Sequence, residues 1–214
     1  MYDVWDKVYS EDSSFFGEGP SNFAKECYIQ FIKKSVKKIL ELGCGQGRDT
    51  LFFVLNNLDV YGIDSSKIAI EGISKLFKKY KKESLKNIKC IDVKLGLPFD
   101  NNYFDAIYSH MFYNMNFTSK ELDFVFHESH RVLKTNGLLY FSVRSNKDKL
   151  FKTGRKIDDN IYEINGFQIR FFNIEEIQLL LSSFNFNIDK IRQDYEEPSN
   201  LYLVFCQKKN NSAQ

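Results

Sequence analysis

The chain has 214 residues, enough for one large α/β domain, and its 43% hydrophobic residues can build a sizeable core. Charged residues make up 27% and prolines number 3, a globular composition that excludes disorder over most of the chain. The 30 Lys and Arg residues against 28 Asp and Glu give a net charge of +2, which supplies no overall field for attracting nucleic acid or an anionic membrane.

The N-terminal residues and the cysteines indicate the compartment. Residues 1–6 are acidic where a signal peptide would be basic, and no run approaches the roughly 18 apolar residues of a membrane span. The 4 cysteines lie far apart without a C-x-x-C pair, so they are expected to be reduced thiols. His127 and His130 have no third ligand nearby in the sequence, so no metal site is predicted. These features predict a cytoplasmic protein.

The first two thirds of the chain alternate strand-length apolar runs with longer helical patterns. Such alternation predicts a parallel, doubly wound sheet. A helix is expected over Ser119–Leu133, opened by a capping box from Thr118 to Glu121. The strands predicted in this part are Lys38–Leu42, Asp59–Asp64, Ile88–Val93, Phe104–Ser109 and Leu138–Val143.

The last third has a different pattern. Two short strand-like pieces, Ile161–Ile164 and Gln168–Phe172, precede an amphipathic helix over Glu175–Phe184. Strands Phe186–Gln193 and Leu201–Gln207 then flank a turn at 196–200 and predict an antiparallel hairpin. The predicted fold class is α/β, with a Rossmann-like, seven-stranded, mostly parallel doubly wound sheet that ends in a C-terminal antiparallel hairpin. We expect one domain over residues 1–209 and a frayed tail at 210–214.

A glycine-rich loop follows the first predicted strand. Gly43, Gly45 and Gly47 lie between that strand and a predicted helix, which is the geometry of a nucleotide site. Glycine lets the backbone approach a ligand closely. A dinucleotide fingerprint requires a third glycine where this chain has Arg48, so the spacing disfavours NAD.

Two acidic residues follow the next predicted strands. Asp64 ends the second strand and is positioned to accept both hydrogen bonds of a ribose diol. Asp92, at the end of the third strand, is placed to accept a hydrogen bond from an adenine amino group. The loop and these acids together predict a site for an adenosine-containing cofactor.

The segment from Glu41 to Gly47 resembles the first motif of the class I S-adenosylmethionine-dependent methyltransferases, Glu/Asp-x-Gly-x-Gly-x-Gly. Residues 97–109 are similar to the family's fourth-strand segment, and 131–139 to its turn into strand five. Residues 135–137 are Thr-Asn-Gly where the family usually has Pro-Gly-Gly, a change that Asn tolerates in a turn. The resemblance covers most of the chain and implies S-adenosyl-L-methionine as cofactor.

The resemblance also implies residue roles. Trp5 and Tyr9 would belong to a cofactor-covering segment, 1–35, or else would pack as a hydrophobic staple on the sheet. Arg48 opposes the helix dipole, so it is expected either to face solvent or to meet the methionyl carboxylate or an anionic substrate. The predicted cofactor-binding residues are Trp5, Tyr9, Glu41, Gly43, Cys44, Gly45, Gly47, Arg48, Asp64, Ser65, Ile68, Asp92, Val93 and Ser109.

The residues after the fourth strand are candidates for the chemistry. Methyl transfer from a sulfonium depends mainly on positioning, and a base is needed only for an acceptor that carries its proton. His110 is the candidate base or substrate ligand, against a purely structural histidine, and Tyr113 is a second candidate. The Asn/Asp-Pro-Pro-Tyr motif of adenine and glutamine amino-group methyltransferases is absent from the sequence.

The region 144–173 is expected to line the acceptor site. It is similar to a small-molecule subgroup resembling the tellurite-resistance-type methyltransferases, which implies Arg144 and Arg170 as anion ligands and Phe172 as a substrate-binding residue. The leading hypothesis is methyl transfer to a small-molecule acceptor by in-line displacement. Alternatives are an RNA or protein methyltransferase and a non-catalytic binder of S-adenosylmethionine or S-adenosylhomocysteine. Neither nucleic acid nor membrane is an expected partner, and the acceptor and oligomeric state stay open.

Overall fold

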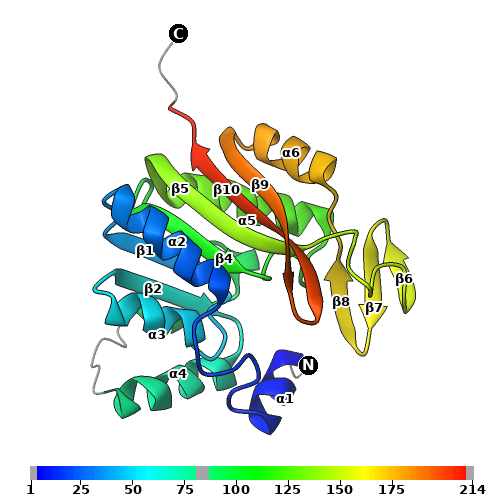
Figure 1. Ribbon diagram of the computed structural model, residues 1–214, viewed down its shortest axis with the longest axis horizontal. Helices are drawn as coiled ribbons and strands as arrows, with labels where there is room; N and C mark the ends of the chain where they lie inside the picture. The colour runs from blue at the N-terminus through cyan, green and yellow to red at the C-terminus, as the bar shows by residue number, and fades with distance from the viewer. Residues whose placement is uncertain (1–3, 81–86, 211–214) are drawn as a thin grey trace. The chain divides into compact units, whose positions relative to one another are not determined.

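The computed structural model describes residues 4–80 and 87–210, and the chain forms two compact units, Met1–Leu95 and Gly96–Gln214 (Figure 1). Apart from Asn210, the predicted frayed tail lies outside the described residues. The prediction of one domain over 1–209 stays a prediction.

The first unit is built of alternating helices and strands. Its three strands run in the order β3-β2-β1, and both neighbouring pairs are parallel. The hydroxyls of Ser21 and Ser66 cap the helices α2 and α4. Each accepts a hydrogen bond from the backbone N–H three residues further along the chain. The elements are α1 Val4–Glu11, α2 Asn22–Lys33, β1 Lys38–Leu42, α3 Arg48–Leu55, β2 Asp59–Asp64, α4 Lys67–Lys79, β3 Ile88–Cys90 and a 3-10 turn, Val93–Leu95.

An apolar cluster in the first unit fixes the position of the glycine loop. Ile73 and Phe77 of α4 are fully buried and pack with Leu51 of α3 and Ile88 of β3. Cys44 belongs to the same cluster, so the loop residue between the first two glycines is anchored in the core.

In the second unit four strands follow the order β4-β5-β10-β9, and a separate three-stranded sheet has the order β6-β7-β8 (Figure 1). Strands β4 and β5 are parallel, whereas β10 is antiparallel to both β5 and β9. The elements are β4 Phe104–His110, α5 Ser119–Val132, β5 Leu133–Arg144, β6 Arg155–Asp158, β7 Ile161–Ile164, β8 Phe167–Arg170, α6 Ile174–Ser183, β9 Phe186–Glu196 and β10 Ser199–Lys208.

The seven strands of the main sheet and the C-terminal hairpin confirm the predicted fold class. Strand directions determine where side chains gather in the second unit. Because β5 runs parallel to β4 and two antiparallel steps lead from β5 to β9, the strands β4, β5 and β9 all end at the same edge. His110, Arg144 and Glu196 are the last residues of these strands.

Several predicted boundaries were wrong. β3 ends at Cys90, so Asp92 follows the strand in a turn, where its carboxylate accepts from Lys94 N. β6 was not predicted, since all four of its residues are exposed and give no apolar alternation. The C-terminal hairpin is longer than expected, because β9 continues to Glu196 and only residues 197–198 separate it from β10.

Candidate functional site

The glycine loop, residues 43–47, is tied to the end of β2. The backbone N–H groups of Gly43 and Cys44 both donate to the Ile63 carbonyl, at 2.9 and 3.0 Å. Gly47 N donates to the Cys44 carbonyl at 2.9 Å, which closes the loop before α3 begins. Gly43, Gly45 and Gly47 have φ of 70°, 50° and 88°, in the left-handed region that favours glycine. The loop is therefore fixed in a conformation that other residues disfavour.

Asp64 connects the loop to the start of α4. Its Oδ2 accepts from Gly45 N and its Oδ1 accepts from Ser66 N, both at 2.9 Å. Asp64 thus organises the loop from the end of β2, and its role as a ribose ligand stays a prediction.

Glu41 lies in the interior beneath the loop. Its side chain accepts a 2.6 Å hydrogen bond from the Thr50 hydroxyl, and the residue is only 4% exposed. Burial, together with the negative charge of Asp49, raises the pKa of Glu41 well above its ordinary value. A ligand carrying positive charge would favour the ionised form of this carboxylate.

The raised pKa of Glu41 predicts a pH-dependent loss of stability. The folded state holds the proton more tightly than the unfolded state, so stability is fully present below the ordinary value, 4.5, and falls as the pH rises through the folded value. We expect the free energy of unfolding of Glu41→Gln to fall less between pH 5 and pH 7 than that of the unaltered chain. Urea titrations at both pH values measure this difference. Glu11→Gln is the control, because the Glu11 side chain is 66% exposed. An equal fall of the unfolding free energy with pH in all three proteins would contradict the prediction.

The N-terminal segment packs on the same loop. Asp6 Oδ1 accepts a 2.5 Å hydrogen bond from the hydroxyl of Ser66, the N-cap of α4. Gln46 of the loop donates through Nε2 to the Asp12 carbonyl at 2.8 Å and accepts from Phe15 N at 3.2 Å. These three bonds attach α1 and the residues after it to the loop and to the start of α4.

Trp5 and Tyr9 stack on each other, with ring centroids 5.4 Å apart. A Cβ atom built on Gly45 would lie 3.1 Å from the Tyr9 hydroxyl oxygen, so this ring sits against the loop backbone. Tyr9 is 7% exposed. Tyr9 therefore packs at the glycine loop with Trp5 stacked on it, and the role of this pair as a cofactor cover stays a prediction.

The charge of Arg48 is compensated within the chain. Its Nη1 donates to the Phe16 carbonyl at 2.7 Å, and its Nε lies 3.3 Å from Asp49 Oδ1. The neighbouring carboxylate and carbonyl offset the unfavourable position of a cation in the first turn of α3. A contact with the methionyl carboxylate stays a prediction.

The other predicted cofactor ligands of the first unit lie around the end of β2. Ser65 and Asp92 are exposed, Ile68 is half-buried and Val93 is buried. Ile68 N lies 3.4 Å from Asp6 Oδ1, which brings it to the N-terminal segment. Ser109 belongs to the second unit, where its hydroxyl is buried without a hydrogen-bond partner among the described residues.

The charged side chains around the glycine loop of the first unit fit a cationic adenosine cofactor. Asp6, Glu41, Asp49 and Asp64 place carboxylates at or next to the loop, whereas the guanidinium of Arg48 already contacts Asp49. S-adenosylmethionine carries a sulfonium charge that such acids favour. A dinucleotide would bring two phosphate charges to the same acids.

Gly47 predicts a strong effect of a small substitution. At φ 88°, a Cβ on this residue would lie 2.6 Å from Cγ1 of the fully buried Ile73. We expect Gly47→Ala to lower the free energy of unfolding by about 2–4 kcal/mol, since backbone strain and overpacking add. Gly17→Ala is the control, because Gly17 has φ 83° and nothing within 4 Å of such a Cβ. Urea unfolding measures both; equal losses would show that the Ile73 contact costs nothing.

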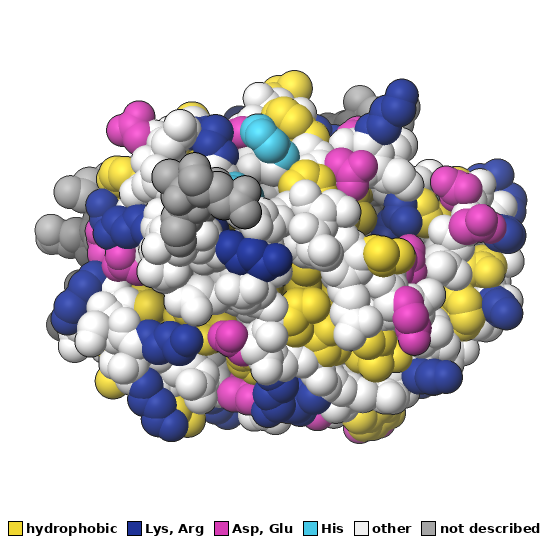
Figure 2. Space-filling model, turned by 90° about the horizontal axis from the view of Figure 1, so that it is seen from above, with side chains coloured by type: hydrophobic (Ala, Val, Ile, Leu, Met, Phe, Trp, Pro, Cys, Tyr) yellow, Lys and Arg dark blue, Asp and Glu magenta, His cyan; other side chains and the backbone are white. Residues whose placement is uncertain are grey.

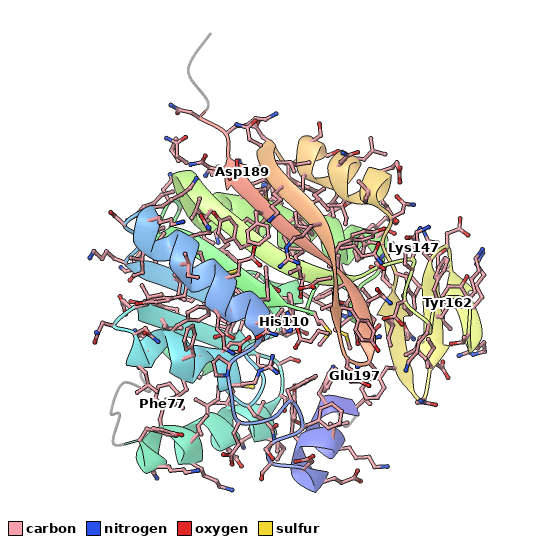
Figure 3. The ribbon with its side chains drawn as sticks, viewed as in Figure 1. Phe77, His110, Lys147, Tyr162, Asp189 and Glu197 are labelled. Atoms are coloured by element: carbon pink, nitrogen blue, oxygen red, sulfur yellow. The ribbon has the colours of Figure 1, made fainter. Side chains whose placement is uncertain are left out.

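In the second unit, His110 contacts residues from two other strands. Its Nδ1 is 2.7 Å from the hydroxyl oxygen of Ser142 on β5. The same hydroxyl oxygen accepts a hydrogen bond from Met111 N at 2.9 Å. Its Nε2 lies 3.2 Å from Glu196 Oε2 at the end of β9. Figure 3 labels His110 at the end of β4 and Glu197 at the tip of the β9–β10 hairpin. His110 is thus held in one orientation.

Tyr113 lies in the core. It is fully buried, its hydroxyl is 3.0 Å from the Ser129 hydroxyl, and its ring stacks on Phe126 at 4.5 Å. Burial raises the pKa of the Tyr113 phenol, which opposes its ionisation. These contacts describe a structural side chain, so we do not retain Tyr113 as a proton-transfer candidate.

Arg144 is paired with a buried carboxylate. Its Nη1 donates to Asp148 Oδ2 at 2.9 Å, and that same oxygen accepts from Asn200 N at 2.8 Å. Asp148 Oδ1 accepts from Leu150 N at 2.9 Å. Arg144 therefore ties the end of β5 to the start of β10, a structural role that weakens its assignment as an anion ligand.

Arg170 is less completely neutralised. The residue is 7% exposed, its Nη1 lies 3.8 Å from Glu176 Oε1, and Nη2 donates to the Ser119 hydroxyl at 3.2 Å. Among the described residues, neither Arg170 Nε nor the side-chain oxygen Oδ1 of Asn114 has a hydrogen-bond partner. The two residues are joined through their backbones, because Arg170 N donates to the Asn114 carbonyl. Phe172 is 2% exposed, and its backbone joins Arg144 and Asn146. Of the two arginines, Arg170 is the better candidate for an anion.

Sequence reasoning missed Ser142, Glu196 and Asp148. Glu196 was assigned to the hairpin turn, and only the full length of β9 brings it to the strand ends. Asp148 had a local signal, because it follows Arg144 at the i,i+4 spacing of an ion pair. Ser142 had none, since it is one small residue in an apolar strand.

Other surfaces show no comparable arrangement. On the face drawn in Figure 2, Lys and Arg side chains lie among Asp and Glu side chains and do not gather in one patch. Within 4–80 and 87–210, no cluster of three or more His, Cys, Asp or Glu side chains suits a metal ion. The helices of these same residues include none with the length and apolar character needed to cross a membrane.

A protein-family model and a curated relative match part of the chain. The family model described as a methyltransferase domain matches residues 39–137, which include parts of both units. The biotin biosynthesis bifunctional protein BioHC of Saccharophagus degradans is 34% identical over 113 residues, or 53% of this chain. The chain spans only 19% of the length of that relative.

Solved structures show the same fold. An S-adenosylmethionine-dependent methyltransferase of Methanosarcina mazei has a TM-score of 0.72 at 22% identity, over 81% of this chain and 93% of that protein. The 1,6-didemethyltoxoflavin-N1-methyltransferase of Burkholderia thailandensis, solved with its substrate and S-adenosylhomocysteine, has a TM-score of 0.69 at 16% identity, over 88% and 79% of the two chains. At these identities the neighbours show the fold, which is the α/β fold predicted from the sequence.

Proposed function

We propose that this chain, whose residues 39–137 match the family model described as a methyltransferase domain, transfers the methyl group of S-adenosylmethionine to a small-molecule acceptor. The observation that carries the proposal is the glycine loop pinned by Asp64. One carboxylate accepts from both Gly45 N and Ser66 N, and we assign the ribose hydroxyl groups of the cofactor to this same side chain.

The acidic surroundings of the loop support the choice of cofactor. Glu41 and Asp64, with Asp6 of the N-terminal segment, favour a ligand that brings positive charge. When bound, S-adenosylmethionine would supply a methyl group on a sulfonium: a nucleophile bonds to the methyl carbon while the carbon–sulfur bond breaks and S-adenosylhomocysteine leaves. The residues of the first unit bind and orient it, and Trp5 and Tyr9 exclude water from the loop.

A small acceptor is supported by two observations. The Burkholderia neighbour binds 1,6-didemethyltoxoflavin, a small molecule. The face in Figure 2 lacks the basic strip that a nucleic acid would need. We assign acceptor recognition to the second unit, with Arg170 as the residue for an anionic group of the acceptor. Likeness to the tellurite-resistance-type subgroup rests on Arg144 and Arg170 and is part of this proposal.

Calorimetry of the purified protein with S-adenosylmethionine, S-adenosylhomocysteine and NAD tests the proposal. We expect the first two to bind and NAD not to bind. Turnover is then measured with methyl-labelled cofactor against phenols, N-heterocycles, carboxylic acids and thiols. Binding without turnover of any acceptor would favour a non-catalytic binder, transfer to RNA or protein would replace the acceptor assignment, and NAD binding would overturn the proposal.

A further inference from the structure

Three carboxyl groups surround the glycine loop of the first unit. Glu41 lies on β1, two residues before the loop, Asp49 lies in the first turn of α3, and Asp64 ends β2. The charges of both aspartates act on Glu41, and Arg48 contributes the opposing positive charge. The Cys44 thiol beside them adds no charge, because burial raises its pKa well above the ordinary value. Three negative charges against one positive charge in a buried region favour a proton on one of the acids.

Hydrogen bonds distinguish Glu41 from the other two acids. Asp64 accepts from two backbone N–H groups at 2.9 Å, and Asp49 accepts from the backbone N–H and the hydroxyl of Ser21 at 2.7 and 2.8 Å. Within 4–80 and 87–210, the carboxyl group of Glu41 makes one hydrogen bond, from the hydroxyl of the fully buried Thr50. Hydrogen bonds to a carboxylate favour its ionised form. Glu41 is therefore the acid of the three that is best suited to hold a proton.

The charge state of a ligand at the loop would act directly on this proton. S-adenosylmethionine and S-adenosylhomocysteine differ by one methyl group and by the positive charge of the sulfonium. A charge in a poorly hydrated region acts over several ångströms with little screening. A sulfonium at the glycine loop thus favours ionised Glu41, which is only 4% exposed, whereas the uncharged sulfur of the product does not.

We propose that Glu41 determines the preference of the loop for the charged cofactor over its product: it holds a proton in the ligand-free chain and releases that proton to solvent when S-adenosylmethionine binds. The inference rests on the proposed function and concerns the same loop. The O–H bond of the carboxyl group breaks, its electron pair stays on the carboxylate, and water carries the proton away. After methyl transfer the sulfur is uncharged, so a buried carboxylate disfavours the product complex until Glu41 regains a proton.

The first test counts protons. Calorimetry in two buffers of different ionisation enthalpy gives the number of protons released for each ligand bound. We compare S-adenosylmethionine with S-adenosylhomocysteine between pH 5.5 and 7.0, below the range of about 7.7–8.0 in which an α-amino group titrates. The methylated cofactor should release more protons than the product. Its Kd should fall by about three- to tenfold as the pH rises over this range, because binding favours the ionised form, and the Kd of the product should not fall.

Glu41→Gln and Glu71→Gln form the matched pair of variants. Glutamine keeps the size of the side chain and takes up no proton. We expect Glu41→Gln to release equal numbers of protons with both ligands, and the preference for S-adenosylmethionine over S-adenosylhomocysteine to fall about tenfold. Glu71 is an exposed residue of α4 in the same unit, so Glu71→Gln should behave as the unaltered chain does.

A second test observes the proton itself. Carbon-13 NMR of glutamate-labelled protein reports whether each carboxyl group is protonated, and the spectrum of Glu41→Gln identifies the Glu41 signal. At pH 5.5 we expect protonated Glu41 in the ligand-free chain and in the product complex, and ionised Glu41 once S-adenosylmethionine is added.

Three outcomes overturn the assignment of Glu41: equal proton release with both ligands in the unaltered chain, ionised Glu41 in the ligand-free chain at pH 5.5, and a proton difference that persists in Glu41→Gln. The first needs no variant, so it decides the matter even if Glu41→Gln does not fold. Absence of S-adenosylmethionine binding would overturn the assignment together with the proposed function. Binding without methyl transfer to any small acceptor would overturn the proposed function alone, because the proton counts need no acceptor.

Discussion

Asp64→Ala is expected to weaken binding of S-adenosylmethionine by about 1–3 kcal/mol, which raises Kd roughly 5- to 150-fold. The substitution removes the acceptor for a ribose diol. It also removes the carboxylate to which Gly45 N and Ser66 N both donate at 2.9 Å, so the loop loses the bond that fixes its second glycine. Calorimetry with S-adenosylmethionine measures the change.

Asp59→Ala is the matched control for Asp64→Ala. Asp59 begins the same strand, β2, and its carboxylate accepts from Asn87 Nδ2 at 3.1 Å. It lies at the opposite end of the strand from the loop, so we expect the affinity of that variant to be unchanged. Equal affinities in both variants and the unaltered chain would show that Asp64 is not a cofactor ligand.

Asp148→Ala is expected to cost about 3–5 kcal/mol of unfolding free energy. The side chain of Asp148 is 0% exposed and accepts from Arg144 Nη1, Asn200 N and Leu150 N. Its removal leaves a guanidinium that is 15% exposed without its carboxylate, and two backbone donors without an acceptor. Urea unfolding measures the loss.

Asp159→Ala provides the control for Asp148→Ala. Asp159 also pairs with a cation, since Lys156 Nζ lies 2.8 Å from its Oδ1, but the side chain is 92% exposed. Exposed ion pairs contribute little, so we expect the urea midpoint to move only slightly. If Asp148→Ala also lost little free energy of unfolding, water would have replaced the carboxylate at the end of β5, and the prediction would be wrong.

Local signals in the sequence predicted the main helices and the loop. Thr118 with Glu121 was predicted as a helix start, and the pair forms a capping box at α5. Asn173 and Glu176 form a second capping box at the start of α6. Such boxes involve residues three apart, so their geometry is set within one turn. The glycine loop also depends on neighbouring residues, which is why its place between β1 and α3 could be predicted.

The acceptor half of the site depends on distant contacts and was predicted less well. His110 was recognised because it follows a strand, but Ser142 and Glu196 reach it only through the pairing of β5, β10 and β9. Tyr113 was chosen for its chemistry, and its burial against Phe126 depends on how α5 packs. Sequence spacing carries no measure of burial, so it could not separate a reactive side chain from a structural one.

Trp5 is the single tryptophan of the chain, and it lies in α1, stacked on the tyrosine that contacts Gly45. The intrinsic indole emission of the protein therefore originates from one place. A titration followed at the indole emission wavelength would record how the N-terminal helix responds to a ligand at the glycine loop, with no label attached.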